Sequence, residues 1–194
     1  HPVAGAFFEA ARREDARPSV LAGGFRARAV DLVRGLCVLM DGRDQRGPIA
    51  WLGTAEGAGQ AQLEAAGVQL LAVPDDDEKA QSLSRAAAFI HVSTGNRVPL
   101  AAAQAMAAGV PCLVSDTPSH RALIRHGETG FVCTSERDFL EKLVVLLGDR
   151  SERERIGQAA RAEAQRCFTS RHFERALLRA YGFSSGSKAL AHVH

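Results

Sequence analysis

Short, continuously apolar runs alternate with longer segments of helical periodicity, and this alternation constrains the fold of the chain more than any other feature. The apolar runs are the expected strands: Ser19–Ala22, Ile49–Leu52, Val68–Val73, Ala88–Val92, Cys112–Ser115 and Phe131–Cys133. Strands that are apolar on both sides are typical of parallel sheets covered on both faces. The pattern therefore predicts an α/β fold: a Rossmann-like open parallel sheet of about six strands with helices on both faces.

The segments between these runs carry the expected helices, which are Val30–Met40, Gln60–Ala66, Glu78–Ala86, Leu100–Ala108 and His120–Arg125. After Cys133 the pattern becomes helical, and three C-terminal helices are expected: Phe139–Leu147, a second that runs from Ser151 to about Arg166, and His172–Tyr181. We expect one domain over residues 1–183 and a fraying tail over residues 184–194, which are rich in Ser and Gly.

Cap residues mark the ends of two of these C-terminal helices. Ser135, followed three residues later by Asp138, predicts the N-cap of the first helix, and Gly148 is expected to close it. Ser151 is the expected N-cap of the second helix.

Length and charge exclude several classes of protein. With 194 residues, the chain suggests one domain, or one domain with a helical appendage. Its 24 Lys and Arg residues nearly balance 22 Asp and Glu residues, which argues against nucleic acid as the main partner because phosphate backbones select a strong basic excess. We find no signal peptide, and residues 98–114 are too short and too interrupted to span a membrane. The sequence predicts a cytoplasmic protein.

The four cysteines are Cys37, Cys112, Cys133 and Cys167. No two of them form a CxxC pair, and none has a histidine at zinc-finger spacing. We therefore expect reduced, buried thiols and no metal site.

Three loops lie between an expected strand and the helix that follows it, where parallel sheets bind ligands. In the first, Gly23 and Gly24 allow close backbone approach, and Arg26 and Arg28 lie beside a helix N-terminus. This combination suits a diphosphate, although a tight turn with solvent-facing arginines explains it too. The second loop, residues 53–59, is rich in glycine but carries no phosphate-binding motif, and turn chemistry explains it.

The third loop, residues 93–100, leads into an alanine-rich helix that ends near Gly109. Asn96 precedes this helix and Gln104 lies about one turn inside it, so that both side chains can face one pocket. The simpler alternatives are a turn-forming asparagine and a surface glutamine.

His91 lies in an expected buried strand with no nucleophile or carboxylate pair beside it, which favours a hydrogen-bonded core residue over a ligand.

The stretch from Ala87 to Asp116, which contains Gln104-Ala105-Met106-Ala107-Ala108-Gly109-Val110-Pro111, resembles the signature of the C-terminal domain of GT-B glycosyltransferases of the retaining family 4 (group 1). The segment Ile124–Val132 is similar to a second family segment, and Gly23–Leu32 loosely resembles the family's first loop. His1-Pro2-Val3 and Phe7 resemble the linker that enters this domain. The resemblance implies one half of a GT-B fold, the donor-binding half, with the N-terminal acceptor domain absent from this chain.

That resemblance also implies a reaction. The sugar of a nucleotide-diphosphate sugar would pass to an acceptor, here unknown, with retention of the anomeric configuration. It implies no metal or other cofactor, because basic side chains and helix N-termini neutralise the leaving diphosphate. Because the family reacts in the cleft between its two domains, we expect no activity from this domain alone. A role in polysaccharide biosynthesis is implied, with any association with the inner membrane face made through the missing half.

Several residues depart from the family pattern. The family has two glutamates separated by seven residues, and here Asn96 and Gln104 occupy these positions. The first would contact the transferred sugar and the second the ribose, and each amide is expected to weaken binding roughly tenfold. Pro99 replaces a glycine in the donor loop Arg97-Val98-Pro99-Leu100, which removes one N–H.

The remaining binding positions fall in the first loop and near the third strand. Arg28 stands at the family's lysine position, Gly24 at its arginine position, and Arg26 is the possible substitute. The base would be recognised through the main chain around Leu71 and Val73. Two alternatives remain: a catalytically silent relative that acts as a binding or assembly module, and a GT-B sugar-nucleotide epimerase.

Overall fold

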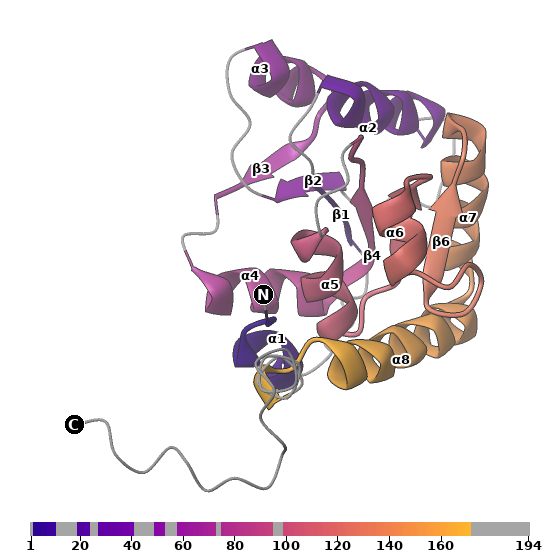
Figure 1. Cartoon of the computed structure of the whole chain (residues 1–194). Coiled ribbons are helices and arrows are strands. Elements are labelled where there is room, and N and C mark those ends of the chain that lie inside the picture. The colour runs from indigo at the N-terminus through magenta and orange to yellow at the C-terminus, as the bar shows by residue number, and fades with distance from the viewer. Residues whose placement is uncertain are drawn as a thin grey trace, which may run out of the picture.

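Six strands form one parallel sheet at the centre of the computed structural model (Figure 1). The structure describes residues 2–10, 19–23, 27–40, 49–52, 58–72, 75–94 and 99–171. The strands are β1 (Ser19–Gly23), β2 (Ile49–Leu52), β3 (Gln69–Leu71), β4 (Ala86–His91), β5 (Cys112–Ser115) and β6 (Gly130–Cys133). They lie in the order β3-β2-β1-β4-β5-β6, and every neighbouring pair is parallel. The predicted α/β open sheet is confirmed.

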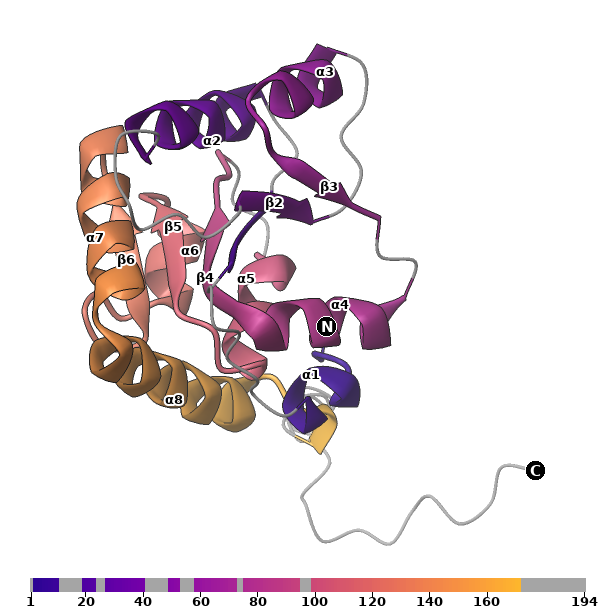
Figure 2. The same ribbon diagram turned by 180° about the vertical axis from the view of Figure 1, so that it is seen from behind.

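Helices cover both faces of this sheet (Figures 1 and 2). On one face lie α2 (Ala27–Met40), α3 (Ala58–Ala65) and α7 (Glu136–Gly148), whose buried side chains include Leu36, Leu63 and Leu143. On the other lie α1 (Gly5–Glu9), α4 (Asp76–Arg85), α5 (Leu100–Ala107), α6 (Pro118–Leu123) and α8 (Arg150–Cys167). The figures show α8 running from the end of α7 to α1. Because both faces are covered, the strand sequences show no polar alternation.

Polar side chains begin four of these helices. The side chains of Asp75, Thr117, Ser135 and Asp149 each accept a hydrogen bond from the backbone N–H three residues later, in α4, α6, α7 and α8. The Ser135 cap is confirmed, and the Thr134 N–H also donates to Asp138 Oδ2 at 3.1 Å.

The predicted cap at Ser151 is wrong. Helix α8 begins at Arg150, directly after α7, so Ser151 lies inside its first turn. Asp149 closes α7 and caps α8, and its Oδ1 accepts from the Glu152 N–H at 3.0 Å. Gly148 is accordingly the last residue of α7 rather than the residue that follows it.

Several further boundaries differ from the sequence prediction by one to three residues, and one helix was missed. Strand β4 begins at Ala86, two residues early, because that residue already turns into the extended conformation and pairs with Ser19 of β1. Strand β3 is shorter than Val68–Val73. Helix α1 was not predicted: it buries Phe7 in the core, while the Val3 N–H donates to the Phe168 carbonyl at 2.9 Å. The helix expected over residues 172–181 and the tail over 184–194 lie outside the described residues.

No disulfide joins the four cysteines, all of which lie in the described ranges. Cys112 and Cys133 are buried as predicted, and burial raises the pKa of the Cys133 thiol to about 12. Cys37 and Cys167 are only half-buried, so the prediction of four buried thiols is wrong for these two, which lie on helices at the surface of the fold. Among the described helices, none combines the length and the apolar character that crossing a bilayer requires.

One buried charge stabilises the end of α7. Arg153 of α8 is 5% exposed, and its Nη1 donates to the carbonyls of Leu146 and Leu147 at 2.6 and 3.4 Å. These carbonyls belong to the last turn of α7, where no helical N–H follows to pair with them.

We expect Arg153→Met to lower the free energy of unfolding by about 2 kcal/mol, because it leaves these buried carbonyls without their charged donor. Urea denaturation measures the change. The matched control is Arg150→Met, which removes an exposed ion pair with Glu154 on the same helix and should cost less than about 0.5 kcal/mol. Equal effects of the two substitutions would contradict this account.

Candidate functional site

The ends of β1 and β4 lie side by side at the point where the order of the strands reverses. From β1 the chain proceeds outward through β2 and β3, and from β4 it proceeds the other way through β5 and β6. Gly23, the last residue of β1, is in register with His91, the last residue of β4. A parallel sheet opens a crevice at such a switch point, outside the carboxyl ends of the strands. The first and third loops selected from the sequence therefore start next to each other.

Strand β1 ends at Gly23, which has no side chain. A Cβ atom on Gly23 would lie 3.4 Å from Phe89 Cζ and 3.6 Å from the Leu52 carbonyl oxygen. Glycine therefore leaves space at the crevice, immediately beside His91. Gly24 and Arg26 lie outside the described residues; Arg28 lies in the first turn of α2, and its side chain is outside the description.

The third loop enters α5 at Pro99, which is buried and supplies no side-chain cap. Leu100, the first residue of α5, is 40% exposed, which is unusual for a large apolar side chain in this fold. Asn96, Arg97 and Val98 lie outside the described residues.

Gln104 lies one turn further along α5, below Leu100 on the same side of the helix. It is 6% exposed, so the alternative of a surface glutamine is wrong. Its Oε1 is fully enclosed and has no hydrogen-bond partner, the one side-chain atom of this kind in the described part of the chain. Leaving such a group unsatisfied costs about 1–3 kcal/mol, so an unpaired oxygen needs an explanation.

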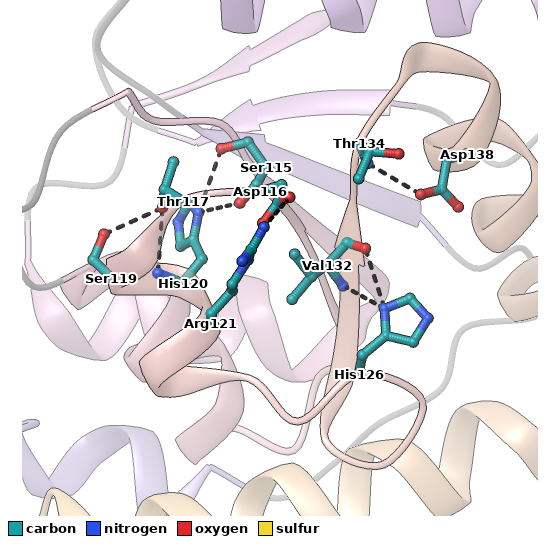
Figure 3. A network of polar contacts seen from close by, with 10 residues as sticks. All are labelled: Ser115, Asp116, Thr117, Ser119, His120, Arg121, His126, Val132, Thr134 and Asp138. Carbon is teal, nitrogen blue, oxygen red and sulfur yellow. Dashed lines mark hydrogen bonds and ion pairs between the residues drawn. The ribbon is translucent and has the colours of Figure 1, made fainter.

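His91 forms a buried pair with His120 of α6. The His91 Nδ1 and the His120 Nε2 are 2.9 Å apart, and the two rings meet edge to face. Figure 3 shows the other side of this pair, where His120 Nδ1 lies 2.7 Å from the Ser115 carbonyl oxygen and 3.3 Å from Ser115 Oγ. This confirms His91 as a hydrogen-bonded core residue. The pairing with His120 was not predicted.

Burial, the nearby His120 and the charge of Lys79 lower the pKa of His91 to about 4. Burial also lowers the pKa of His120, although the hydrogen bond to Ser115 opposes this shift. Both imidazoles are therefore neutral near pH 7.

These shifts predict a loss of stability in mild acid. Unfolded histidines titrate near 6.5, so between about pH 6.5 and pH 4 the unfolded chain binds more protons than the folded chain. The free energy of unfolding should fall as the pH drops through this window, and His91→Gln should reduce the fall by on the order of 2 kcal/mol. Urea denaturation at several pH values measures both slopes. Gln158→Leu, at an exposed position of α8, is the control and should keep the wild-type slope.

A cleft of about 670 Å³ opens beside the carboxyl ends of β4, β5 and β6. Hydroxyl side chains follow each of these strands and line it: Ser93, Thr94, Ser115, Thr117, Thr134 and Ser135. The carboxylates of Asp31, Asp116 and Glu136 line it too, whereas the described lining contains no lysine or arginine. Asp116 is already paired with Arg121, whose Nη2 donates at 2.6 Å (Figure 3). This composition suits the hydroxyls of an uncharged ligand better than a diphosphate.

Sequence reasoning missed this cleft, although a signal was present: a Ser or Thr follows each of the three strands.

Two residues were proposed to recognise the base. Leu71 ends β3, is partly buried and packs against the core on the α4 and α5 side, whereas Val73 lies outside the described residues. Within the described ranges, no cluster of three or more His, Cys, Asp or Glu side chains is arranged to hold a metal ion.

Comparisons with known proteins agree with this architecture. A family model described as glycosyl transferases group 1 matches residues 56–163, more than half of the chain. No curated protein gave a significant match to the sequence.

Solved structures with this fold include glycosyltransferase domains. The C-terminal domain of a glycosyl transferase group 1 family protein (LpcC) from Francisella tularensis has a TM-score of 0.65 and 15% identity, over 79% of this chain and 87% of that one. Sucrose-phosphate synthase from Thermosynechococcus elongatus has a TM-score of 0.70 and 18% identity, over 86% of this chain and 45% of that one. Anabaena HepE in complex with UDP and glucose has a TM-score of 0.68 and 15% identity, over 86% of this chain and 49% of that one. The chain thus spans less than half of the two longer proteins, and these identities establish the fold alone.

Proposed function

The chain belongs to the group 1 glycosyl transferases, and on this basis we propose that it is the donor-binding half of a retaining, family 4-like glycosyltransferase. The donor is a nucleotide-diphosphate sugar, which binds in the crevice between the ends of β1 and β4. The sugar passes to an acceptor held by a second domain, with the anomeric configuration retained.

The unpaired oxygen of Gln104 is the observation that carries this proposal. An enclosed amide oxygen without a donor lowers stability, and a hydroxyl of a bound ribose would supply the missing hydrogen bond. Gln104 lies one turn inside α5, on the same side of the helix as the exposed Leu100 at its start. At the surface, water would supply this hydrogen bond and no ligand would be needed.

The start of α5 offers a second feature that suits the donor. Asp75, Thr117, Ser135 and Asp149 occupy the N-termini of α4, α6, α7 and α8 with polar side chains, whereas Pro99 at the N-terminus of α5 has none to offer. The N–H groups of the first turn and the helix dipole favour a negative group at this end. A diphosphate placed there would also lie close to the end of β1, because Gly23 and His91 are in register.

Individual roles follow from this placement. Gln104 binds the ribose and Asn96 the transferred sugar, at the two positions where the family has glutamates. The backbone of Gly23 and Gly24 and the side chains of Arg26 and Arg28 hold the diphosphate, together with the loop Arg97-Val98-Pro99-Leu100. The main chain around Leu71 and Val73 contacts the base. Basic side chains and helix N–H groups stabilise the leaving diphosphate without a metal.

Residues 1–183 form this donor half in our proposal, and the acceptor domain is its partner in a reaction at the cytoplasmic face.

Amides in place of both glutamates raise one alternative, a binding or assembly module without turnover. Restoring both carboxylates, in the double variant Asn96→Glu and Gln104→Glu, distinguishes the two when sugar transfer is measured in the complete protein. Transfer by the wild-type protein supports the enzyme, whereas transfer that appears only in the double variant supports the silent module. Absence of transfer in both would contradict the enzymatic proposal.

A further inference from the structure

The hydrogen bonds of the histidine pair define which nitrogen carries each proton. The Ser115 carbonyl oxygen can only accept, so His120 Nδ1 carries a hydrogen and donates to it at 2.7 Å. Because His120 is neutral, its Nε2 is an acceptor. The His91 Nδ1 lies 2.9 Å from this nitrogen and must therefore donate. By the same argument, the Nε2 of His91 carries no hydrogen and presents a lone pair.

His91 is the last residue of β4 and lies opposite Gly23, at the edge of the crevice. In the described part of the chain its Nε2 has no hydrogen-bond partner, and this atom is not among the fully enclosed, unpartnered ones. The His91 ring stacks on Phe89 with 6.2 Å between ring centroids. It therefore lies on the α4 and α5 side of the sheet, beside Gly23 at the end of β1.

We propose that His91 Nε2 accepts a hydrogen bond from a hydroxyl of the bound nucleotide sugar, and that His120 is the positioning residue that keeps His91 in the accepting tautomer. The inference rests on the proposed function and adds to it a binding residue and its chemical preference. A lone pair attracts a hydroxyl hydrogen and repels a phosphate oxygen. The hydroxyl belongs either to the ribose or to the transferred sugar.

The surroundings of the pair keep His91 neutral in this role. From α6 it faces His120, and from α4 the partly buried ammonium of Lys79 lies near enough to oppose a second positive charge. Ser115 contributes a carbonyl and a hydroxyl from β5, both of which act on His120. The accepting tautomer is therefore the form present at neutral pH.

Two substitutions of His91 distinguish the role of its Nδ1 from that of its Nε2. His91→Asn keeps a donor at the position of Nδ1 and loses the acceptor at Nε2, whereas His91→Gln places its amide oxygen near Nε2. We measure the dissociation constant, by calorimetry on the 194-residue chain, for the tightest binder among UDP-glucose, UDP-N-acetylglucosamine and GDP-mannose. His91→Asn should bind about fivefold more weakly, and His91→Gln should return to within about twofold of the wild type. His120→Asn, which keeps the bond to Ser115 and releases His91, should weaken binding about threefold.

The corresponding nucleoside diphosphate identifies the hydroxyl. A fivefold loss for both ligands assigns His91 to the ribose, and a loss confined to the intact nucleotide sugar assigns it to the transferred sugar. Wild-type affinity of His91→Asn for both ligands would overturn the inference and leave the proposed function intact. A wild-type chain that binds none of the three donors would contradict the proposed function itself.

The tautomer provides a test that needs no ligand. Long-range ¹⁵N–¹H NMR spectra of the wild-type chain at pH 7 should show His91 with its hydrogen on Nδ1 and a bare Nε2. Substitution of His120 by Asn should populate the other tautomer. A hydrogen on Nε2 of His91 in the wild type would overturn the inference whatever the binding data show.

Discussion

Replacing Gln104 by leucine is expected to stabilise the chain and to weaken its binding of a nucleotide sugar at the same time. The leucine removes an enclosed oxygen that has no partner, which should raise the free energy of unfolding by about 1–2 kcal/mol. It also removes the group that we assign to the ribose, which should raise the dissociation constant about 10- to 100-fold. Few substitutions separate a binding role from a structural role so clearly, because a structural amide would lose stability on replacement.

Urea denaturation and calorimetric titration measure the two effects on the same protein. Gln158→Leu, at an exposed position of α8, is the matched control and should change neither quantity appreciably. Gln104→Glu should act in the opposite direction, because a buried carboxylate destabilises the empty protein and strengthens the bond to a hydroxyl. A less stable Gln104→Leu variant with unchanged affinity would contradict the assigned role.

Replacing Gly157 by alanine is expected to lower the free energy of unfolding by about 3–4 kcal/mol, far more than one methyl group usually costs. Helix α8 approaches the turn that follows α5 so closely that a Cβ on Gly157 would lie 2.3 Å from the Gly109 carbonyl oxygen and 3.3 Å from its carbon. Backbone atoms form the obstacle, so no side chain can rotate away. The two helices must separate, and the shift would disturb the helix that carries Gln104.

A decrease of about 10 °C in the melting temperature should accompany this loss. Gly35→Ala is the matched control, because a Cβ there would meet only the flexible end of Glu136 at 3.5 Å and the position lies inside α2. That control should be neutral or slightly stabilising, since alanine favours the helix. Equal melting temperatures for Gly157→Ala and the wild type would contradict the close approach of α5 and α8.

The sheet was predictable from the sequence because each strand is buried on both faces and therefore appears as an uninterrupted apolar run. Ile49–Leu52 and Cys112–Ser115 have the predicted bounds. Helix ends were harder to predict where two helices are adjacent. Asp149 is both the C-cap of α7 and the N-cap of α8, so no connecting residue separates the two helices. A prediction that allows for such a connection places the N-cap of α8 at Ser151. Helix α1 was missed because five residues carry too little periodicity to be recognised.

The site was predictable only in part. Strand topology brings the loops after β1 and β4 together, and the rule for parallel sheets anticipates this from the order of elements. Contacts between side chains of distant elements carry no such pattern. His91 and His120 are 29 residues apart, and only the register of β4 against β5 and the start of α6 bring their rings together. The burial of Gln104 likewise depends on how closely other elements surround α5, which its own alanine-rich sequence does not specify.

Calorimetric titration of the 194-residue chain with UDP-glucose, UDP-N-acetylglucosamine and GDP-mannose tests the central claim most directly. The account predicts saturable heat with at least one of them at a dissociation constant below about 1 mM, and a marked loss of that heat in Gln104→Leu. Absence of saturable heat from all three donors, in a chain shown to be folded by its urea transition, would contradict donor binding in this crevice.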